Sequence, residues 1–250
     1  SSQNTAQSID ALAKNGYPNF TIPYEQELNP AQLSAVCHLH GPALVLAGAG
    51  TGKTRVLVYR LARLVESGIP PEHILLLTFT RKSASEMLRR ASTMLGGRCD
   101  KVHGGTFHSF AHRILRRFAG ELGFNQTFSV IDQADVEDAM NLIRNRRTTQ
   151  KTKRRFPQKH TLATIYGLSV NMCKTVDDII HEQYPQFIQE IDDISQLFIQ
   201  YVNYKRQHHL MDYDDLLVYL LMLLESKPHI AAQLQKEYQF IMIDEYQDTN

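Results

Sequence analysis

Short apolar runs alternate with amphipathic stretches in the first half of the chain. Continuous apolar runs at residues 43–50 and 73–80 end in glycines or polar residues, which is typical of buried strands. Each run is followed by a stretch with apolar residues at helical spacing, at residues 51–68 and 81–95. Strands that alternate with helices predict a parallel sheet, because the helices serve as crossovers between the strands.

The pattern continues and then changes in the second half. Residues 102–108 are a third predicted strand, and residues 109–123 are the helix that follows it. Residues 133 to about 226 read almost wholly as helices, and a strand pattern returns only at residues 240–244. We therefore predict an α/β fold in which a helical subdomain is inserted before the last strand of a parallel sheet.

The first 23 residues differ from the rest of the chain. They are rich in Ser, Gln and Asn and are interrupted by Pro18 and Pro23. Because such a segment has few apolar residues to bury, we predict that residues 1–23 form a poorly ordered arm.

Composition narrows the class of protein. The 250 residues include 27 Lys and Arg against 26 Asp and Glu, so any nucleic-acid role depends on local patches. The three cysteines form no CxxC pair, which favours reduced thiols in a cytosolic protein, and no His or Cys spacing indicates a zinc site. No apolar run reaches about 18 residues and no signal peptide opens the chain, so we expect a cytoplasmic protein without a membrane partner.

The stretch "AGAGTGKT", residues 47–54, follows a predicted strand and opens a predicted helix. Glycines in this position let backbone N–H groups face a phosphate at the positive end of the helix. Lys53 then neutralises β- and γ-phosphate oxygens, and the Thr54 hydroxyl ligates Mg²⁺. Ala47 stands where such loops usually have their first glycine, although three glycines remain in the loop. The alternative is a glycine-rich turn without a ligand.

Asp244 and Glu245 follow the apolar run of the last predicted strand. A phosphate-binding loop needs a carboxylate for Mg²⁺ at the end of a neighbouring strand, and Asp244 fits that role. Glu245 is then placed to orient and deprotonate the attacking water. Alone, such an acidic pair after an apolar run also marks a helix start or a solvated turn.

Six segments in order resemble one family. They are "LNPAQLSAV" (28–36), "AGAGTGKTR" (47–55), "TFTRKSASEM" (78–87), "GTFHSFAHRIL" (105–115), "MDYDDLL" (211–217) and "DEYQDTN" (244–250). Together they resemble the glutamine motif, motifs I and Ia, the TFHS motif, an acidic segment and motif II of UvrD/Rep/PcrA-type superfamily-one DNA helicases.

The resemblance implies a RecA-like P-loop fold that is truncated after the Walker B motif. Residues 24–115 and 211–250 are then two segments of the first RecA-like motor domain, and residues 116–210 are the inserted helical subdomain. It also implies a parent protein that uses ATP and Mg²⁺ to translocate on single-stranded DNA and to unwind duplex at junctions. We expect the 250 residues to be an N-terminal fragment that is inactive as a motor without the second motor domain of its parent.

The resemblance assigns residues to the nucleotide. Gln32 reads the adenine edge, for which its amide has a suitable donor and acceptor; without the family, a surface glutamine on a helix is the simpler interpretation. Catalysis is assigned to Lys53, Asp244 and Glu245, and Mg²⁺ to Thr54 and Asp244. The residues expected to contact the nucleotide are Gln32, Ala47, Gly48, Ala49, Gly50, Thr51, Gly52, Lys53, Thr54 and Arg55.

Residues near strand ends are expected to contact a single DNA strand. Phe79 suits stacking on a base, and polar neighbours suit phosphates. The alternative is that Phe79 is a core aromatic, which is what we expect of Phe107. Arg81 stands where family members often carry Asn. The complete expected set is Phe79, Thr80, Arg81, Thr106, His108 and Ser109.

The basic run at residues 144–155 is either a solvated loop or a further DNA contact, and charge alone does not decide between them. Two other functions stay open. One is the helicase portion of a RecB/AddA-like helicase–nuclease, and the other is a P-loop ATPase switch that does not translocate. Oligomeric state, polarity and pathway do not follow from the sequence.

Overall fold

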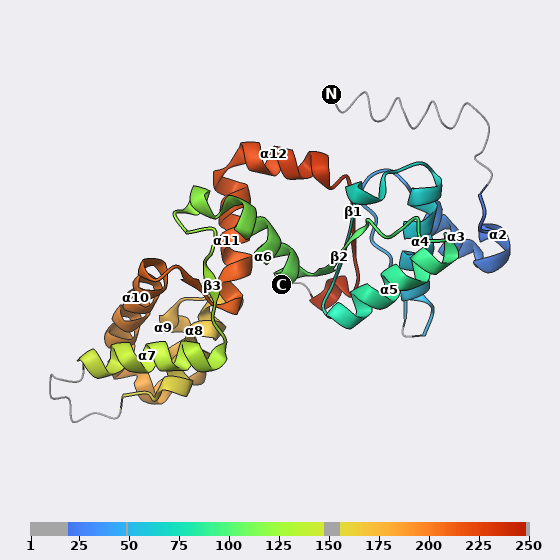
Figure 1. Ribbon diagram of the computed structural model, residues 1–250. Coiled ribbons are helices and arrows are strands. Elements are labelled where there is room, and N and C mark those ends of the chain that lie inside the picture. The colour runs from blue at the N-terminus through green and yellow to red at the C-terminus, as the bar shows by residue number, and fades with distance from the viewer. Residues whose placement is uncertain (1–19, 49, 148–155, 249–250) are drawn as a thin grey trace. The chain divides into compact units, whose positions relative to one another are not determined.

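The structure, a computed structural model, describes residues 20–48, 50–147 and 156–248 (Figure 1). The chain divides into two compact units. The first contains the described residues up to Thr106 together with Gln233–Tyr246, and the second contains Phe107–Ala232 and the described residues after Tyr246.

The first unit contains a parallel three-stranded sheet. Its strands are β1 (Ile74–Thr78), β2 (His103–Thr106) and β5 (Phe240–Ile243), in the order β2-β1-β5. All five residues of β1 are buried, because β1 is the central strand. The backbone N–H of Asp244 donates to the carbonyl of Leu77 at 3.0 Å, so the β5 ladder extends one residue further. These strands confirm the predictions at residues 73–80, 102–108 and 240–244.

Helices of the first unit pack against this sheet. In these helices apolar residues recur at helical spacing, and the stripe that they form is buried against the sheet. Leu61, Leu64 and Met87 accordingly share one core cluster with Ile74 of β1. The predicted helices after the first two apolar runs are confirmed. The helices are α2 (Tyr24–Glu27), α3 (Pro30–Cys37), α4 (Lys53–Glu66) and α5 (Arg81–Met94), with a 3-10 turn, η1 (Pro71–His73).

The strand predicted at residues 43–50 is wrong for the part that the structure describes. Residues 43–48 belong to no strand, and Leu44, Val45 and Leu46 are exposed at 66%, 46% and 86%. A strand exists only through hydrogen bonds to a neighbouring strand. The apolar pattern indicates that these residues tend to be buried, but it does not show that a neighbouring strand is available for hydrogen bonding.

The last residues of the predicted N-terminal arm are folded. The backbone N–H of Thr21 donates to Glu66 at 2.6 Å, and Ile22 is buried in the core of the first unit. The Arg63 guanidinium lies 3.4 Å from the centre of the Phe20 ring. These contacts tie residues 20–23 to α4, whereas residues 1–19 of the predicted arm lie outside the described residues.

The second unit is mainly helical. A buried cluster that includes Met140, Ile165, Leu197 and Tyr201 forms its core. Two short strands, β3 (Ser129–Val130) and β4 (Leu210–Met211), pair in parallel. The helices that begin in this unit are α6 (Phe107–Phe118), α7 (Gln133–Arg147), α8 (Lys159–Asn171), α9 (Val176–Gln183), α10 (Ile191–Gln207), α11 (Tyr213–Ser226) and α12 (Pro228–Glu237); the 3-10 turns η2 (Ala119–Leu122), η3 (Pro185–Glu190) and η4 (Tyr246–Asp248) complete the described elements.

The two units group α6 and α11 with the helical part of the chain. The domain boundaries expected from the sequence, after residue 115 and before residue 211, instead assign these helices to the motor domain. Residues 148–155, most of the basic run, lie outside the described residues. No helix within residues 20–48, 50–147 or 156–248 is long and apolar enough to cross a membrane.

Candidate functional site

The described part of the glycine-rich loop forms a tight turn before α4. Gly50 and Gly52 have φ angles of +76° and +91°, values that residues other than glycine rarely adopt. The Thr51 hydroxyl donates to the Gly48 carbonyl at 2.7 Å and closes the turn. Helix α4 starts at Lys53 without a side-chain cap, so its first N–H groups are directed at the space in front of the helix. Of the predicted loop residues, Ala49 lies outside the described residues.

The Gln32 side chain is linked to this loop. Its Nε2 donates to the Thr51 carbonyl at 3.0 Å, and its Oε1 accepts from the Asn29 backbone N–H at 3.2 Å. A Cβ atom on Gly52 would lie 2.8 Å from Gln32 Nε2. The predicted adenine-reading residue therefore also supports the loop, a contact that sequence reasoning missed.

Asp244 and Glu245 lie at the carboxyl end of β5. Glu245 has a φ angle of +53°, a left-handed conformation that costs a residue with a side chain about 1 kcal/mol or more. Its carboxylate lies 3.9 Å from the Lys53 ammonium. Burial raises the pKa of Asp244, the Glu245 charge raises it further, and Lys53 opposes both effects. The structure thus brings the three predicted catalytic residues together.

The residues present fit a magnesium nucleotide. The Thr54 hydroxyl and the Asp244 carboxylate are oxygen ligands of the kind that Mg²⁺ prefers, and the uncapped N-terminus of α4 suits a phosphate. Bound Mg²⁺ offsets the negative charge of the phosphate groups. Lys53 would hold phosphate oxygens, and Glu245 would take a proton from water.

Arg55, another predicted nucleotide ligand, is engaged elsewhere on the first unit. Its guanidinium donates to the Glu27 carboxylate at 2.7 Å and to the Tyr59 hydroxyl at 3.1 Å. Glu27 and Tyr59 belong to α2 and α4, and no sequence motif pointed to this pairing. To contact adenine, Arg55 would therefore have to use another guanidinium N–H or break its bond to the Glu27 carboxylate.

The predicted DNA contacts of the first unit lie where β1 and β2 end. Phe79 is 45% exposed, which contradicts the alternative that it is a core aromatic. Thr80 is the N-cap of α5 and accepts from the Ser83 N–H at 3.1 Å, a structural role that sequence reasoning missed. Arg81 is exposed at the first position of α5, whereas Thr106 is buried at the end of β2.

The other predicted DNA contacts lie at the start of α6 in the second unit. The His108 ring stacks on the Tyr213 ring with their centres 4.1 Å apart and their planes 18° apart. Burial lowers the pKa of His108, and the Asp214 charge opposes this effect. Ser109 and Phe107 are half-buried. Tyr213 was not predicted, although "MDYDDLL" was recognised as a motif.

Comparison with known proteins decides the family. A family model for the UvrD/REP helicase N-terminal domain matches residues 28–250. The chain belongs to this family. The resemblance inferred from its motifs is thereby confirmed.

Curated relatives of this UvrD/REP-family chain include ATP-dependent DNA helicases. It is 35% identical to ATP-dependent DNA helicase PcrA of Bacillus subtilis (strain 168) over 229 residues, which cover 89% of the chain and 30% of the relative. It is 35% identical over 230 residues to the PcrA protein of Staphylococcus epidermidis, covering 90% of the chain and 30% of the relative. The chain thus spans about 30% of the length of these relatives.

Proposed function

We propose that this chain is the N-terminal ATP-binding part of an ATP-dependent DNA helicase that acts in the cytoplasm. The observation that carries the proposal is the approach of the Lys53 ammonium to the Glu245 carboxylate at 3.9 Å, beside Asp244. A cation for phosphates, a carboxylate for Mg²⁺ and a base for water are the groups that phosphoryl transfer to water requires. Family membership adds that relatives of this chain are helicases.

In this proposal, ATP binds along the loop Gly48–Thr54, with its phosphates at the N-terminus of α4. Thr54 and Asp244 hold Mg²⁺, Lys53 holds the β- and γ-phosphates, and Glu245 is the general base. Support comes from the left-handed glycines of the loop and from its uncapped helix. Gln32 reads adenine, and this requires its amide to exchange the Thr51 carbonyl for the base.

The first unit is proposed to be a RecA-like motor domain. Parallel strands that carry their polar residues at the carboxyl ends are the usual setting for a nucleotide site. The side chains at residues 44–46 and of Ile241 on β5 are apolar and exposed. This supports a larger sheet, because exposed apolar side chains gain stability when a further element packs against them. We infer that residues 43–48 pair as a strand when the sheet gains a further strand.

Single-stranded DNA is the proposed partner at Phe79, Thr80, Arg81, Thr106, His108 and Ser109. An exposed phenylalanine next to an exposed arginine suits a base and a phosphate of one strand. Thr80 and Thr106 are weaker candidates, because one caps α5 and the other is buried.

The parent protein is proposed to translocate on single-stranded DNA and to unwind duplex, in repair or replication. The 250 residues alone are proposed to bind Mg²⁺ and ATP without turnover at a motor-like rate, because the relatives are more than three times as long. An arginine from a second motor domain typically contributes roughly 10³ to 10⁵ in rate.

The test is ATP hydrolysis by the full-length protein with and without single-stranded DNA, together with strand displacement. Turnover that DNA stimulates, coupled to displacement, supports a motor. Turnover that DNA leaves unchanged identifies a P-loop switch instead. Strand displacement accompanied by DNA degradation identifies the helicase–nuclease alternative.

A further inference from the structure

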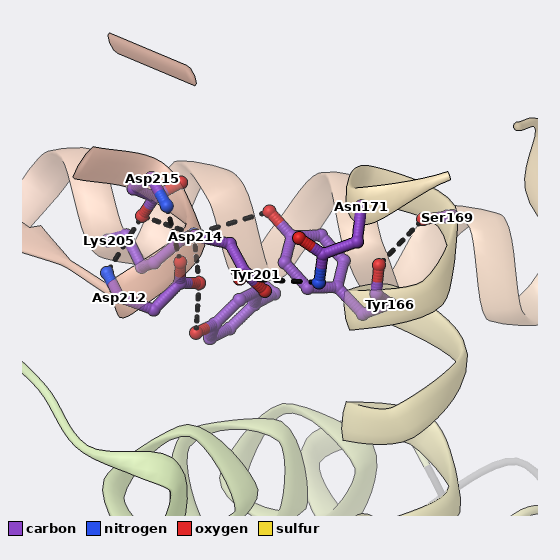
Figure 2. A network of polar contacts seen from close by, with 8 residues as sticks. All are labelled: Tyr166, Ser169, Asn171, Tyr201, Lys205, Asp212, Asp214 and Asp215. Carbon is purple, nitrogen blue, oxygen red and sulfur yellow. Dashed lines mark hydrogen bonds and ion pairs between the residues drawn. The ribbon is translucent and has the colours of Figure 1, made fainter. Parts of the chain in front are cut away.

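The second unit buries a lysine beside two carboxylates. Lys205, in the last turn of α10, is fully buried, and its Nζ lies 2.6 Å from Asp212 Oδ2 and 2.6 Å from Asp215 Oδ2 (Figure 2). The third ammonium proton is directed at the Tyr166 hydroxyl, 3.2 Å away. All three donors of the ammonium group therefore have acceptors.

The two carboxylates also hold the start of α11. The Asp215 N–H donates to Asp212 Oδ1 at 2.9 Å, and the Asp212 N–H donates to Asp215 Oδ2 at 2.9 Å. This reciprocal pair is a capping box on α11. The Tyr201 hydroxyl adds a bond to Asp212 Oδ2 at 3.0 Å. Lys205 thus binds both ends of the first turn of α11 and fixes it against α10.

Stability alone does not explain such a network. Taking an ammonium and two carboxylates out of water costs free energy, and replacing buried ion pairs by apolar groups is often neutral or stabilising. Burial raises the pKa of Asp215 in spite of the adjacent ammonium, which reflects this cost. Where such a network exists, the benefit to look for is a fixed geometry.

The geometry that this network fixes is that of the two residues between its carboxylates. Tyr213 stacks on His108 at 4.1 Å, and Asp214 Oδ1 accepts from Asn171 Nδ2 at 3.3 Å. Tyr213 is itself 56% exposed, so core packing does not hold its ring in place. Because Tyr213 lies directly after Asp212, a change in the first turn of α11 moves the Tyr213 ring relative to His108.

We propose that Lys205 is a positioning residue for DNA binding, which acts through the first turn of α11 on the stack between Tyr213 and His108. The inference rests on the proposed function, in which His108 contacts DNA. It adds to that function a buried residue that touches no DNA and yet determines the orientation of one that does.

The test uses the 250-residue chain and the double variant Lys205→Met/Asp215→Asn. Lys205→Met alone leaves two carboxylates buried without their cation and risks unfolding. The double variant removes one charge of each sign. The Asp212 carboxylate that remains keeps its bonds from the Tyr201 hydroxyl and from the N–H of residue 215, and the new amide oxygen still accepts from the Asp212 N–H. Lys174→Met is the matched control, because Lys174 pairs with Glu182 of α9 at 2.7 Å in the same unit and not with the carboxylates of Asp212 and Asp215.

Two readouts separate positioning from general stability. The first is the nuclear Overhauser effect between the His108 and Tyr213 rings, with the melting temperature measured on the same samples. The second is affinity for an oligothymidylate, measured by fluorescence anisotropy. We expect the double variant to melt within a few degrees of wild type, to lose the ring contact and to bind DNA about five- to tenfold more weakly. Added to His108→Ala, it should weaken binding no further.

A ring contact that persists in the folded double variant overturns the proposal. So does unchanged DNA affinity when the contact is lost and His108→Ala weakens binding. If His108→Ala itself leaves DNA affinity unchanged, the proposed DNA contact at His108 is wrong, and with it the role of Lys205 in DNA binding. The ring contact then still decides whether Lys205 sets the stack.

Discussion

The ammonium group of Lys53 lies 3.9 Å from the carboxylate of Glu245, although the two residues lie far apart along the chain. One follows the glycine-rich loop and the other follows β5. At this distance, the Glu245 carboxylate neutralises part of the Lys53 charge, which a phosphate would otherwise attract. In the proposed function, ATP would draw Lys53 from Glu245, and the same movement would free the carboxylate to accept a proton from water.

The first prediction concerns Glu245→Gln. The amide keeps the shape of the side chain but cannot take a proton, so ATP turnover by the full-length protein should fall by roughly 10² to 10⁴. Mg²⁺–ATP affinity of the 250-residue chain should stay within about threefold of wild type, because no phosphate contact is lost. Steady-state hydrolysis and equilibrium binding measure the two effects. Glu72→Gln, in the same unit, is the matched control, and turnover that survives in Glu245→Gln would remove Glu245 from the role of base.

A second prediction uses two left-handed glycines. Gly52→Ala and Gly68→Ala place an alanine at φ angles of +91° and +88°, so each should lower the free energy of unfolding by about 1–2 kcal/mol. The Cβ at residue 52 would meet Gln32, whereas a Cβ at residue 68 would have open space around it among the described residues. Gly52→Ala alone should therefore also weaken nucleotide binding.

Thermal unfolding and ATP titration of both alanine variants check this difference. Equal nucleotide affinity in the two variants would mean that the contact between Gln32 and the loop has no part in binding. Adding Gln32→Ala to Gly52→Ala should cost less affinity than the two single changes together, because both act on one contact.

The prediction for DNA concerns Phe79 and Arg81. Phe79→Ala should weaken oligothymidylate binding roughly 5- to 150-fold, the usual range for one stacked base, and should leave the melting temperature nearly unchanged because Phe79 is 45% exposed. Arg81→Ala should lower the slope of log affinity against log salt concentration by about 0.7, the value for one phosphate contact on a single strand. A salt titration of both variants separates stacking from charge. A large fall in melting temperature for Phe79→Ala would restore the core interpretation.

Much of the candidate site followed from the sequence because its chemistry is local. A loop such as residues 47–54 combines glycine flexibility, a lysine and a hydroxyl within one turn. The approach of Lys53 to Glu245 was also expected, on the argument that the loop and the acidic pair follow neighbouring parallel strands. The structure shows the approach at 3.9 Å, but residues 43–48 before the loop belong to no strand, so that reason does not account for it. The strands at 74–78 and 240–243 were predictable, since both are short apolar runs between polar residues.

Other features depend on tertiary contacts that no local pattern encodes. Residues 43–48 have the composition of a strand, but pairing needs a second edge. Lys205 reads as an ordinary surface lysine near the end of a helix until Asp212 and Asp215 are placed beside it. The spacing of the two aspartates was a readable capping signal; their shared lysine and the Tyr213–His108 stack were not.

The pH dependence of stability tests the buried network. Burial alone lowers the pKa of Lys205, but the carboxylates of Asp215 and Asp212 outweigh it and hold the pKa above its ordinary value of 10.5. A pKa raised by folding means that the stabilisation is fully present below pH 10.5 and is lost as pH rises through the folded-state pKa. The free energy of unfolding should therefore fall with pH in the alkaline range.

Urea unfolding of the chain between pH 8 and about pH 12 measures this slope. Lys205→Met/Asp215→Asn should show a smaller alkaline loss of stability than wild type, and Lys174→Met should show the wild-type loss. Equal slopes in wild type and the double variant would mean that Asp212 and Asp215 do not raise the pKa of Lys205 in the folded state.

The central claim is that this chain binds ATP through the loop before α4 and the acidic pair after β5. The most direct measurement is calorimetric titration of the 250-residue chain with ATP and Mg²⁺, for wild type, Lys53→Ala and the control Lys174→Ala. The account predicts that Lys53→Ala binds at least about tenfold more weakly, because a lysine–phosphate contact is lost, and that Lys174→Ala binds as wild type does. Equal affinity for wild type and a folded Lys53→Ala variant would contradict it.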